Sequence, residues 1–206
     1  MTDATAINCV VFDMDGVLCH TDFARRLEAM AQATGLTADA VDAAIFRSGF
    51  DDRADQGHYD ADAYLLETGE RLGVAISRAD WLDARRAAMT PYPGMLALAQ
   101  EMSGRLTTAM LTNNGPLLRA GFDQVFPEAV EVFGARAFFS SQLGAAKPDR
   151  EVFHRLLAEL DHAPAETLFI DDSADYIAGA RAAGLHTHQF AGEPALRREL
   201  QTLSLL

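Results

Sequence analysis

Acidic side chains follow two apolar runs of this chain, at the points where those runs end. Asp13 and Asp15 follow the first run, and Asp171 and Asp172 follow a later one. Side chains two residues apart in an extended chain point to the same side, so Asp13 and Asp15 should lie close together. Neighbouring carboxylates repel each other unless a cation or a shared proton lies between them. Such a group suits Mg²⁺, and one aspartate could attack a phosphoryl group while another transfers protons.

Hydroxyl, amide and amine groups are placed to complement these acids. Thr112, Asn113 and Asn114 follow a third apolar run, and Lys147 directly precedes Pro148, a position that suits the first turn of a helix. The oxygens of a phosphoryl group carry spread negative charge that needs fixed donors and cations. Thr112, the backbone around Asn113, and Lys147 could supply them.

Short apolar runs alternate with helical patterns over most of the chain. The predicted strands are residues 7–12, 107–111, 137–139, 167–170 and 186–190. The predicted helices between them lie near 94–103, 116–125, 149–160 and 174–183. This alternation predicts an α/β fold with a doubly wound, Rossmann-like parallel sheet covered on both faces. Ligands bind at the carboxyl edge of such a sheet, so residues 13, 112 and 172 should meet there.

A long stretch directly after the first strand has only helical patterns. No convincing strand interrupts residues 19–89. Thr37, Asp60 and Ser77 are expected to cap successive helices, and Arg85 falls among the inward positions of the helix after Ser77. The stretch therefore predicts a small all-α cap inserted after the first strand.

The predicted domain limits follow from where this helical stretch ends. Proline and glycine at 91–94 break the helices, as expected where a chain passes between domains. The core domain is predicted at 1–18 and 91–206, and the cap at 19–90. A cap in this position would lie over the carboxyl edge of the sheet as a lid.

Composition limits the possible classes of protein. The chain has 206 residues, of which 49% are hydrophobic, enough for one globular domain or a domain with an insertion. The net charge of −13 disfavours binding to nucleic acid or to an anionic membrane. There is no apolar run of membrane-spanning length, and residues 1–5 lack the basic start of a secretory signal. Two cysteines make no disulfide framework, and a cytoplasmic location is expected.

Together these segments resemble the haloacid dehalogenase-like (HAD) hydrolase superfamily. Residues 12–18, 111–113, 147–148, and 169–173 with Gly184 resemble its four motifs in order. The helical insertion resembles the small cap of the subgroup with sugar-phosphate phosphatases, phosphoglycolate phosphatase, β-phosphoglucomutase and the dehalogenases. Within that subgroup the chain looks closest to α-glucose-1-phosphate phosphatase-like proteins.

The resemblance implies a Mg²⁺ site built from acidic residues. Asp13 would be both nucleophile and metal ligand. Asp15 would be the general acid and base, with its backbone carbonyl on the metal. Asp172 would be the second carboxylate ligand, while Asp171 would act through water or from outside the ligand set. Tyr176 stands where many relatives carry Asp or Asn.

The resemblance also implies how substrate is bound. Thr112, Asn113 and Asn114 would contact the phosphoryl group, and Lys147 would stabilise its charge. Asn114 with Gly115 is also compatible with a simple turn.

Cap residues would contact the rest of the substrate. Arg53 and His58 are the candidates, because they lie in or beside the expected substrate-facing loop. The acids Asp51, Asp52 and Asp55 are expected to form a solvated loop.

Three functions remain open from the sequence. The first is a Mg²⁺-dependent phosphatase that hydrolyses a small phosphomonoester, for example a sugar phosphate, through an aspartyl-phosphate intermediate. The others are a phosphomutase of the β-phosphoglucomutase type and a non-catalytic binding protein on the same scaffold. A dehalogenase is disfavoured because it would need neither Asp15 nor a carboxylate-bound metal. The expected partner is a small phosphorylated metabolite, and the chain is expected to be a monomer or a homodimer.

Overall fold

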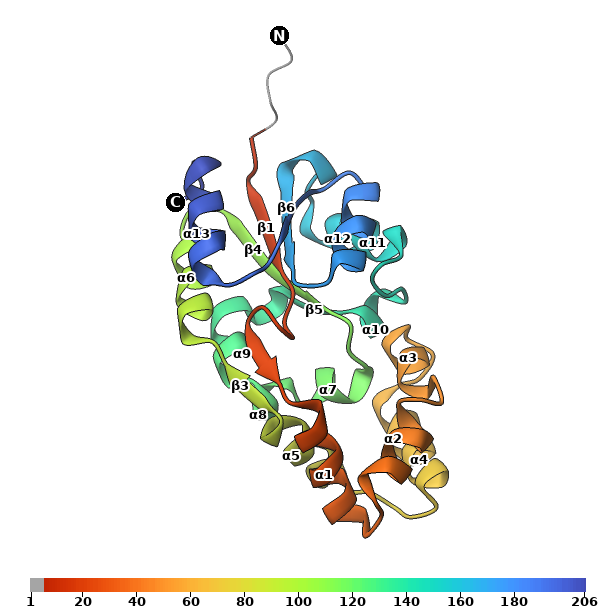
Figure 1. The fold of residues 1–206 in the computed structure, drawn as a ribbon. Helices are drawn as coiled ribbons and strands as arrows, with labels where there is room; N and C mark the ends of the chain where they lie inside the picture. Colours follow the sequence, from red (N-terminus) through yellow and green to blue (C-terminus); the bar gives the residue numbers. More distant parts are fainter. Residues whose placement is uncertain (1–5) are drawn as a thin grey trace.

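A five-stranded parallel sheet forms the centre of the computed structural model, which describes residues 6–206 (Figure 1). The strand order is β5-β4-β1-β6-β7. The strands are β1 (Cys9–Phe12), β4 (Thr107–Thr112), β5 (Ala137–Phe139), β6 (Thr167–Asp171) and β7 (His186–Gln189). Phe12 lies opposite Met110 of β4 and Ile170 of β6, so the three central strands end close together at one edge. The expectation about residues 1–5 lies outside the described residues.

Helices cover both faces of this sheet. One core contains Val10 and Phe12 of β1, packed against α6 (Pro93–Ser103), α9 (Pro127–Phe133) and α13 (Glu193–Thr202). The other core contains Cys9 and Val11, packed against α11 (Arg150–Leu160) and α12 (Ala174–Ala182). Alternate residues of β1 therefore enter opposite cores, as a strand buried on both faces requires. The prediction of a doubly wound α/β fold is confirmed.

The stretch after β1 forms a separate group of helices below the sheet in Figure 1. They are α1 (Phe23–Thr34), α2 (Ala38–Ile45), α3 (Phe50–Asp55), α4 (Ala61–Leu72) and α5 (Arg78–Ala87). The caps predicted at Thr37, Asp60 and Ser77 are confirmed, because each side chain accepts a hydrogen bond from the backbone N–H three residues later. Tyr64 stacks on Phe50, with ring centroids 5.0 Å apart, inside this group.

Two short strands contradict the prediction that no strand interrupts residues 19–89. β2 (Cys19–Thr21) and β3 (Met89–Pro91) pair antiparallel with each other and not with the main sheet. Asp22 N–H donates to Ala88 O at 2.8 Å, so the chain leaves and re-enters the core at neighbouring points. Strands of three residues are too short to show a clear alternation of apolar and polar residues. The division of the chain at 18/19 and 90/91 stays a prediction.

Some predicted helix positions also differ from the structure. The helix predicted near 116–125 is divided at Gly121 into α7 (Pro116–Ala120) and α8 (Phe122–Val125). A Cβ on Gly121 would lie 2.5 Å from Leu82 Cδ1, so a larger residue there would have to displace this buried side chain of α5. Lys147 does not lie in the first turn of α11, because Asp149 is the residue that caps this helix.

The part of the chain that the structure describes has no helix long and apolar enough to cross a membrane. Cys9 and Cys19 are buried and free, as the absence of a disulfide framework predicts.

Candidate active site

The ammonium group of Lys147 lies between two carboxylates at the carboxyl edge of the sheet. Its Nζ is 2.7 Å from Asp13 Oδ1 and 2.7 Å from Asp171 Oδ2. Asp13 directly follows β1, and its backbone N–H donates to Ile170 O at 2.8 Å. Burial raises the pKa of Asp13 to about 8, although Lys147 acts in the opposite direction. Residues that are far apart in the sequence thus meet where the three strands end.

A third carboxylate completes an acidic cluster. Asp13, Asp171 and Asp172 each offer an oxygen, and these oxygens lie within 4.8 Å of one another. A Cβ on Gly16 would overlap the Asp172 carboxylate, so glycine is needed where this side chain lies against the loop after β1. Lys147 brings one positive charge to three acidic groups. The cluster therefore has the oxygen ligands and the excess of negative charge that suit Mg²⁺.

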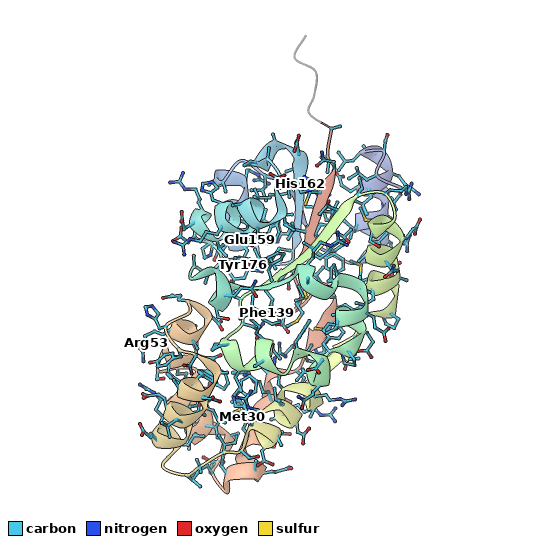
Figure 2. All side chains as sticks on the ribbon, turned by 180° about the vertical axis from the view of Figure 1, so that it is seen from behind. Met30, Arg53, Phe139, Glu159, His162 and Tyr176 are labelled. Atoms are coloured by element: carbon cyan, nitrogen blue, oxygen red, sulfur yellow. The ribbon has the colours of Figure 1, made fainter. Side chains whose placement is uncertain are left out.

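Asn113 holds the loop that carries Lys147. Its Oδ1 accepts from Lys147 N–H at 2.9 Å, and its Nδ2 donates to Lys147 O at 2.9 Å. Tyr176, labelled in Figure 2, contacts both residues: its ring centroid is 4.7 Å from Lys147 Nζ, and its hydroxyl oxygen accepts from Asn113 Nδ2 at 3.4 Å. The Asn113 side chain, which was predicted to bind substrate, therefore makes two hydrogen bonds to the backbone of Lys147 and fixes the position of that residue.

Thr112 and Asn114 form a second group beside the cluster. Asn114 Nδ2 donates to Thr112 Oγ1 at 2.7 Å and to Asp15 Oδ2 at 3.1 Å. Ser140 Oγ accepts from Asn114 N–H at 3.2 Å. Thr112 and Asn114 lie at the end of β4 and Ser140 at the end of β5, whereas Asp15 belongs to the loop after β1. Asn114 therefore links Thr112 with Asp15 and forms more than a simple turn.

The carboxylate of Asp15 is paired with Arg85 and does not belong to the acidic cluster. It accepts two hydrogen bonds from Arg85 Nη2, at 2.7 Å to Oδ1 and 2.9 Å to Oδ2, and one from Thr21 Oγ1. Burial raises the pKa of Asp15, but Arg85, Thr21 and Asn114 more than offset it, so the pKa lies below its usual range. Sequence reasoning expected up to four carboxylates in one group, whereas this structure groups three and pairs the fourth with an arginine.

Arg85 and Thr21 are the site residues that sequence reasoning missed. Thr21 lies in β2 and Arg85 in α5, both outside the motifs. A signal was present, because Arg85 falls on the inward face of its helix with Trp81 and Leu82. A charged side chain at a buried position is rare unless it has a partner.

The cap lies directly against the core loops. A Cβ on Gly115 would lie 3.4 Å from Ala54 Cβ and 3.6 Å from Asp55 Oδ1 of α3. Asp51, Asp52 and Asp55 belong to α3, so the expectation of a solvated loop is wrong. Burial raises the pKa of Asp55 well above its usual range, and the neighbouring Asp51 adds to this effect.

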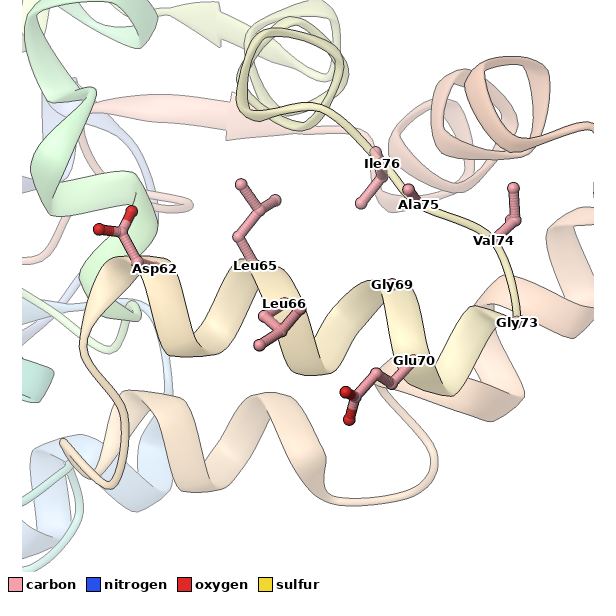
Figure 3. Close-up of a pocket in the computed structure, with 9 residues that line it drawn as sticks. All are labelled: Asp62, Leu65, Leu66, Gly69, Glu70, Gly73, Val74, Ala75 and Ile76. Atoms are coloured by element: carbon pink, nitrogen blue, oxygen red, sulfur yellow. The ribbon is translucent and has the colours of Figure 1, made fainter.

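The two cap residues predicted to bind substrate lie in different places. His58 lines a cavity of about 690 Å³ between the α3–α4 connection and the loop before α11, and Lys147 lines the same cavity. Arg53 lies at the outer edge of the cap in Figure 2. A second cavity, of about 620 Å³, is formed only by cap residues between Asp62 and Ile76 (Figure 3). No candidate site residue lines that second cavity.

Comparisons with known proteins agree with this geometry. The model of the haloacid dehalogenase-like hydrolase family matches residues 7–184. Phosphatase MT3486 of Mycobacterium tuberculosis is 28% identical over 196 residues, which cover 89% of this chain and 87% of that protein. The D-ribitol-5-phosphate phosphatase of Bacteroides thetaiotaomicron is 23% identical, over 96% of this chain and 98% of its own.

Solved structures share the fold over nearly the full length. The HAD family enzyme bt-2542 of Bacteroides thetaiotaomicron, solved as a magnesium complex, has a TM-score of 0.77 at 22% identity. The match covers 94% of this chain and 99% of that one. Because the family model matches most of the chain, including four of the five strands of the sheet and the helices inserted after β1, the chain belongs to the haloacid dehalogenase-like hydrolase family.

Proposed function

We propose that this protein is a Mg²⁺-dependent phosphatase that hydrolyses a small phosphomonoester through an aspartyl-phosphate intermediate. The observation that carries the proposal is the position of Asp13, buried at the carboxyl edge of the sheet and paired with Lys147 at 2.7 Å. Asp171 and Asp172 lie beside it. The phosphatases among its relatives support the same reaction class.

The proposed reaction has two displacements at phosphorus. An oxygen of Asp13 attacks the phosphorus, and the bond from phosphorus to the ester oxygen breaks while the leaving oxygen takes a proton from Asp15. In the second step Asp15 takes a proton from water, and the water oxygen attacks the same phosphorus. This step releases inorganic phosphate and restores the Asp13 carboxylate.

Fixed charges would stabilise the phosphoryl oxygens during both steps. Lys147, whose Nζ lies 2.7 Å from Asp13 Oδ1, would supply positive charge, and the hydroxyl of Thr112 would supply a donor. Asp13 and Asp172 would hold Mg²⁺, with the backbone carbonyl of Asp15 as a third ligand and Asp171 outside the ligand set. When bound, the ion supplies positive charge to the phosphoryl oxygens.

The proposed substrate class is a small, hydroxyl-bearing phosphate ester such as a sugar or polyol phosphate. A relative named for D-ribitol 5-phosphate supports this class. The cavity beside Lys147 also has polar walls, which include Gln56, His58 and Asp149. We further propose that His58 and Arg53 influence substrate choice, and that the protein works in the cytoplasm as a monomer or homodimer.

The test is release of inorganic phosphate from a panel of phosphate esters, with Mg²⁺ and with a chelator. The panel includes D-ribitol 5-phosphate, glucose 1-phosphate and phosphoglycolate. Turnover should require Mg²⁺, and Asp13→Asn should reduce it to background because the amide is a poor nucleophile. Asp123→Asn, an exposed acid on α8, is the matched control and should retain wild-type activity.

The same assay separates the alternatives. An isomeric sugar phosphate with no free phosphate would identify a phosphomutase. Ligand binding without turnover across the panel would support a non-catalytic binding protein. Full activity in Asp13→Asn would remove Asp13 as the nucleophile.

A further inference from the structure

Arg85 makes the most extensive contact with Asp15 of any side chain in the described part of the chain. Its Nη2 donates to both carboxylate oxygens, at 2.7 Å and 2.9 Å. Its Nη1 donates to Thr21 Oγ1 at 3.2 Å, and Thr21 donates to Asp15 Oδ1. The three side chains therefore form a closed ring of hydrogen bonds.

The burial of Arg85 makes this contact unusual. The arginine side chain is 2% exposed, whereas the Asp15 side chain is 34% exposed. A buried guanidinium is costly unless a charged partner compensates, and Asp15 is the carboxylate with which Arg85 forms an ion pair. Of the two side chains, only that of Asp15 is therefore accessible to a ligand.

The two oxygens of Asp15 have different surroundings. Oδ1 accepts from Thr21 of β2 and from Arg85 of α5. Oδ2 also accepts from Arg85, but its other donor comes from the core: Asn114 Nδ2, at 3.1 Å, which also donates to Thr112. Thr112 is a residue that the proposed function places at the phosphoryl group, so Oδ2 is the oxygen on the side of the proposed phosphoryl site.

We infer that Arg85 is a positioning residue for Asp15: together with Thr21, Arg85 holds Oδ1 so that Oδ2 transfers the proton. The inference rests on the proposed function. Arg85 lies in α5 and Thr21 in β2, and these elements connect the cap to the core. The orientation of Asp15 is therefore tied to the position of the cap.

The first test compares kinetic constants of Arg85 variants with those of the wild type. Because orientation is lost while the substrate contacts stay, Arg85→Ala should lower kcat by about 10- to 100-fold and change KM by less than about threefold. Arg85→Lys keeps the charge but lacks the planar fork, so it should retain an intermediate kcat. Arg86→Ala is the matched control, since Arg86 is the adjacent, exposed arginine of the same helix.

Two further measurements separate positioning from a purely structural effect. Methylguanidinium added to Arg85→Ala should restore part of kcat, because it can occupy the space left by the side chain. In an Asp15→Asn background, Arg85→Ala should cause no further loss of kcat, because a residue that acts through Asp15 has nothing left to position. If Arg85→Ala does not fold, Arg85→Lys takes its place in the same double-mutant cycle.

The results distinguish this inference from the proposed function. A raised KM with unchanged kcat would show that Arg85 binds substrate instead, and additive losses in the double variant would also overturn the inference. These two outcomes can be measured only if the wild type is active. A wild type that releases no phosphate from any ester would remove the proposed function and the inference with it.

Discussion

Lys147 is the only basic residue of the described chain that forms an ion pair with Asp13 or Asp171. It forms ion pairs with Asp13 and Asp171, and Asp172 lies beside them. Burial raises the pKa of both Asp13 and Asp172, and the neighbouring Asp171 adds to this effect, so the ionised form of the cluster is costly without a metal ion. Such sites favour function at the expense of stability.

We therefore predict that Asp13→Asn stabilises the metal-free protein. Because the pKa of Asp13 is raised to about 8, folding at neutral pH must protonate this buried carboxyl group, and the neutral amide avoids that cost. The amide still offers Lys147 an acceptor, so the free energy of unfolding in chelator should rise by about 1–3 kcal/mol. Urea denaturation at neutral pH measures it. Addition of Mg²⁺ should stabilise the wild type more than the variant, which lacks a ligand. A variant less stable than the wild type in chelator would contradict this account.

At the residue scale, most candidate site residues could be identified from the sequence. Asp13, Thr112 and Asp171 directly follow or end apolar runs, and their place at the strand ends follows from sheet geometry alone. Arg85 could not be assigned in the same way. Its partner is 70 positions away, and which inward position of a helix meets Asp15 depends on how α5 packs.

The connection between α3 and α4 brings the cap against the core. Gly57 has φ +82°, and a Cβ there would lie 2.5 Å from the backbone oxygen of Ser141. Glycine is therefore favoured at position 57 for two reasons: the backbone has a positive φ, and a side chain would clash with Ser141. Gly73, after α4, has φ +69° with open space around it.

This difference gives a test of the cap contact. Gly57→Ala and Gly73→Ala should each lose about 1–2 kcal/mol of stability through backbone strain. Only Gly57→Ala should also separate the cap from the core loops, which should lower kcat/KM by about tenfold or more. Steady-state kinetics and thermal unfolding of both variants measure the two effects. Equal kinetic losses in both variants would show that strain, not the cap contact, is responsible.

At the element scale, the long helices were predictable and the short strands were not. Thr37, Asp60 and Ser77 have side chains that cap helices, so those starts could be located. β2 and β3 pair with each other although nearly seventy residues separate them in the sequence, and neither strand has a local sequence pattern that predicts it. Only tertiary structure brings them together.

The whole molecule is strongly acidic, with a net charge of −13. A field of this sign attracts divalent cations and repels phosphate esters, and dissolved salt screens it. The order of the elements, by contrast, was predictable, because alternating strands and helices permit few arrangements other than a parallel sheet.

The charge predicts how salt affects metal activation. When KCl is raised from about 0.01 M to about 0.15 M, the Debye length falls from roughly 30 Å to roughly 8 Å. The Mg²⁺ concentration for half-maximal activity should then rise by about two- to tenfold, because the long-range attraction is lost. Titration of Mg²⁺ at each salt concentration measures it, with sucrose as an uncharged control. An unchanged midpoint would mean that only the local ligands set the affinity.

The pairing of β2 with β3 also has an evolutionary consequence. Asp22 and Ala88 are joined by a backbone hydrogen bond, so the two ends of the helical insertion are neighbours. Two paired strands lie about 5 Å apart, a gap that an insertion of almost any length or shape can bridge. Genetic exchange of the segment could therefore change the substrate without rebuilding the sheet. Arg85 limits this freedom, because any replacement insertion must again bring a partner to Asp15.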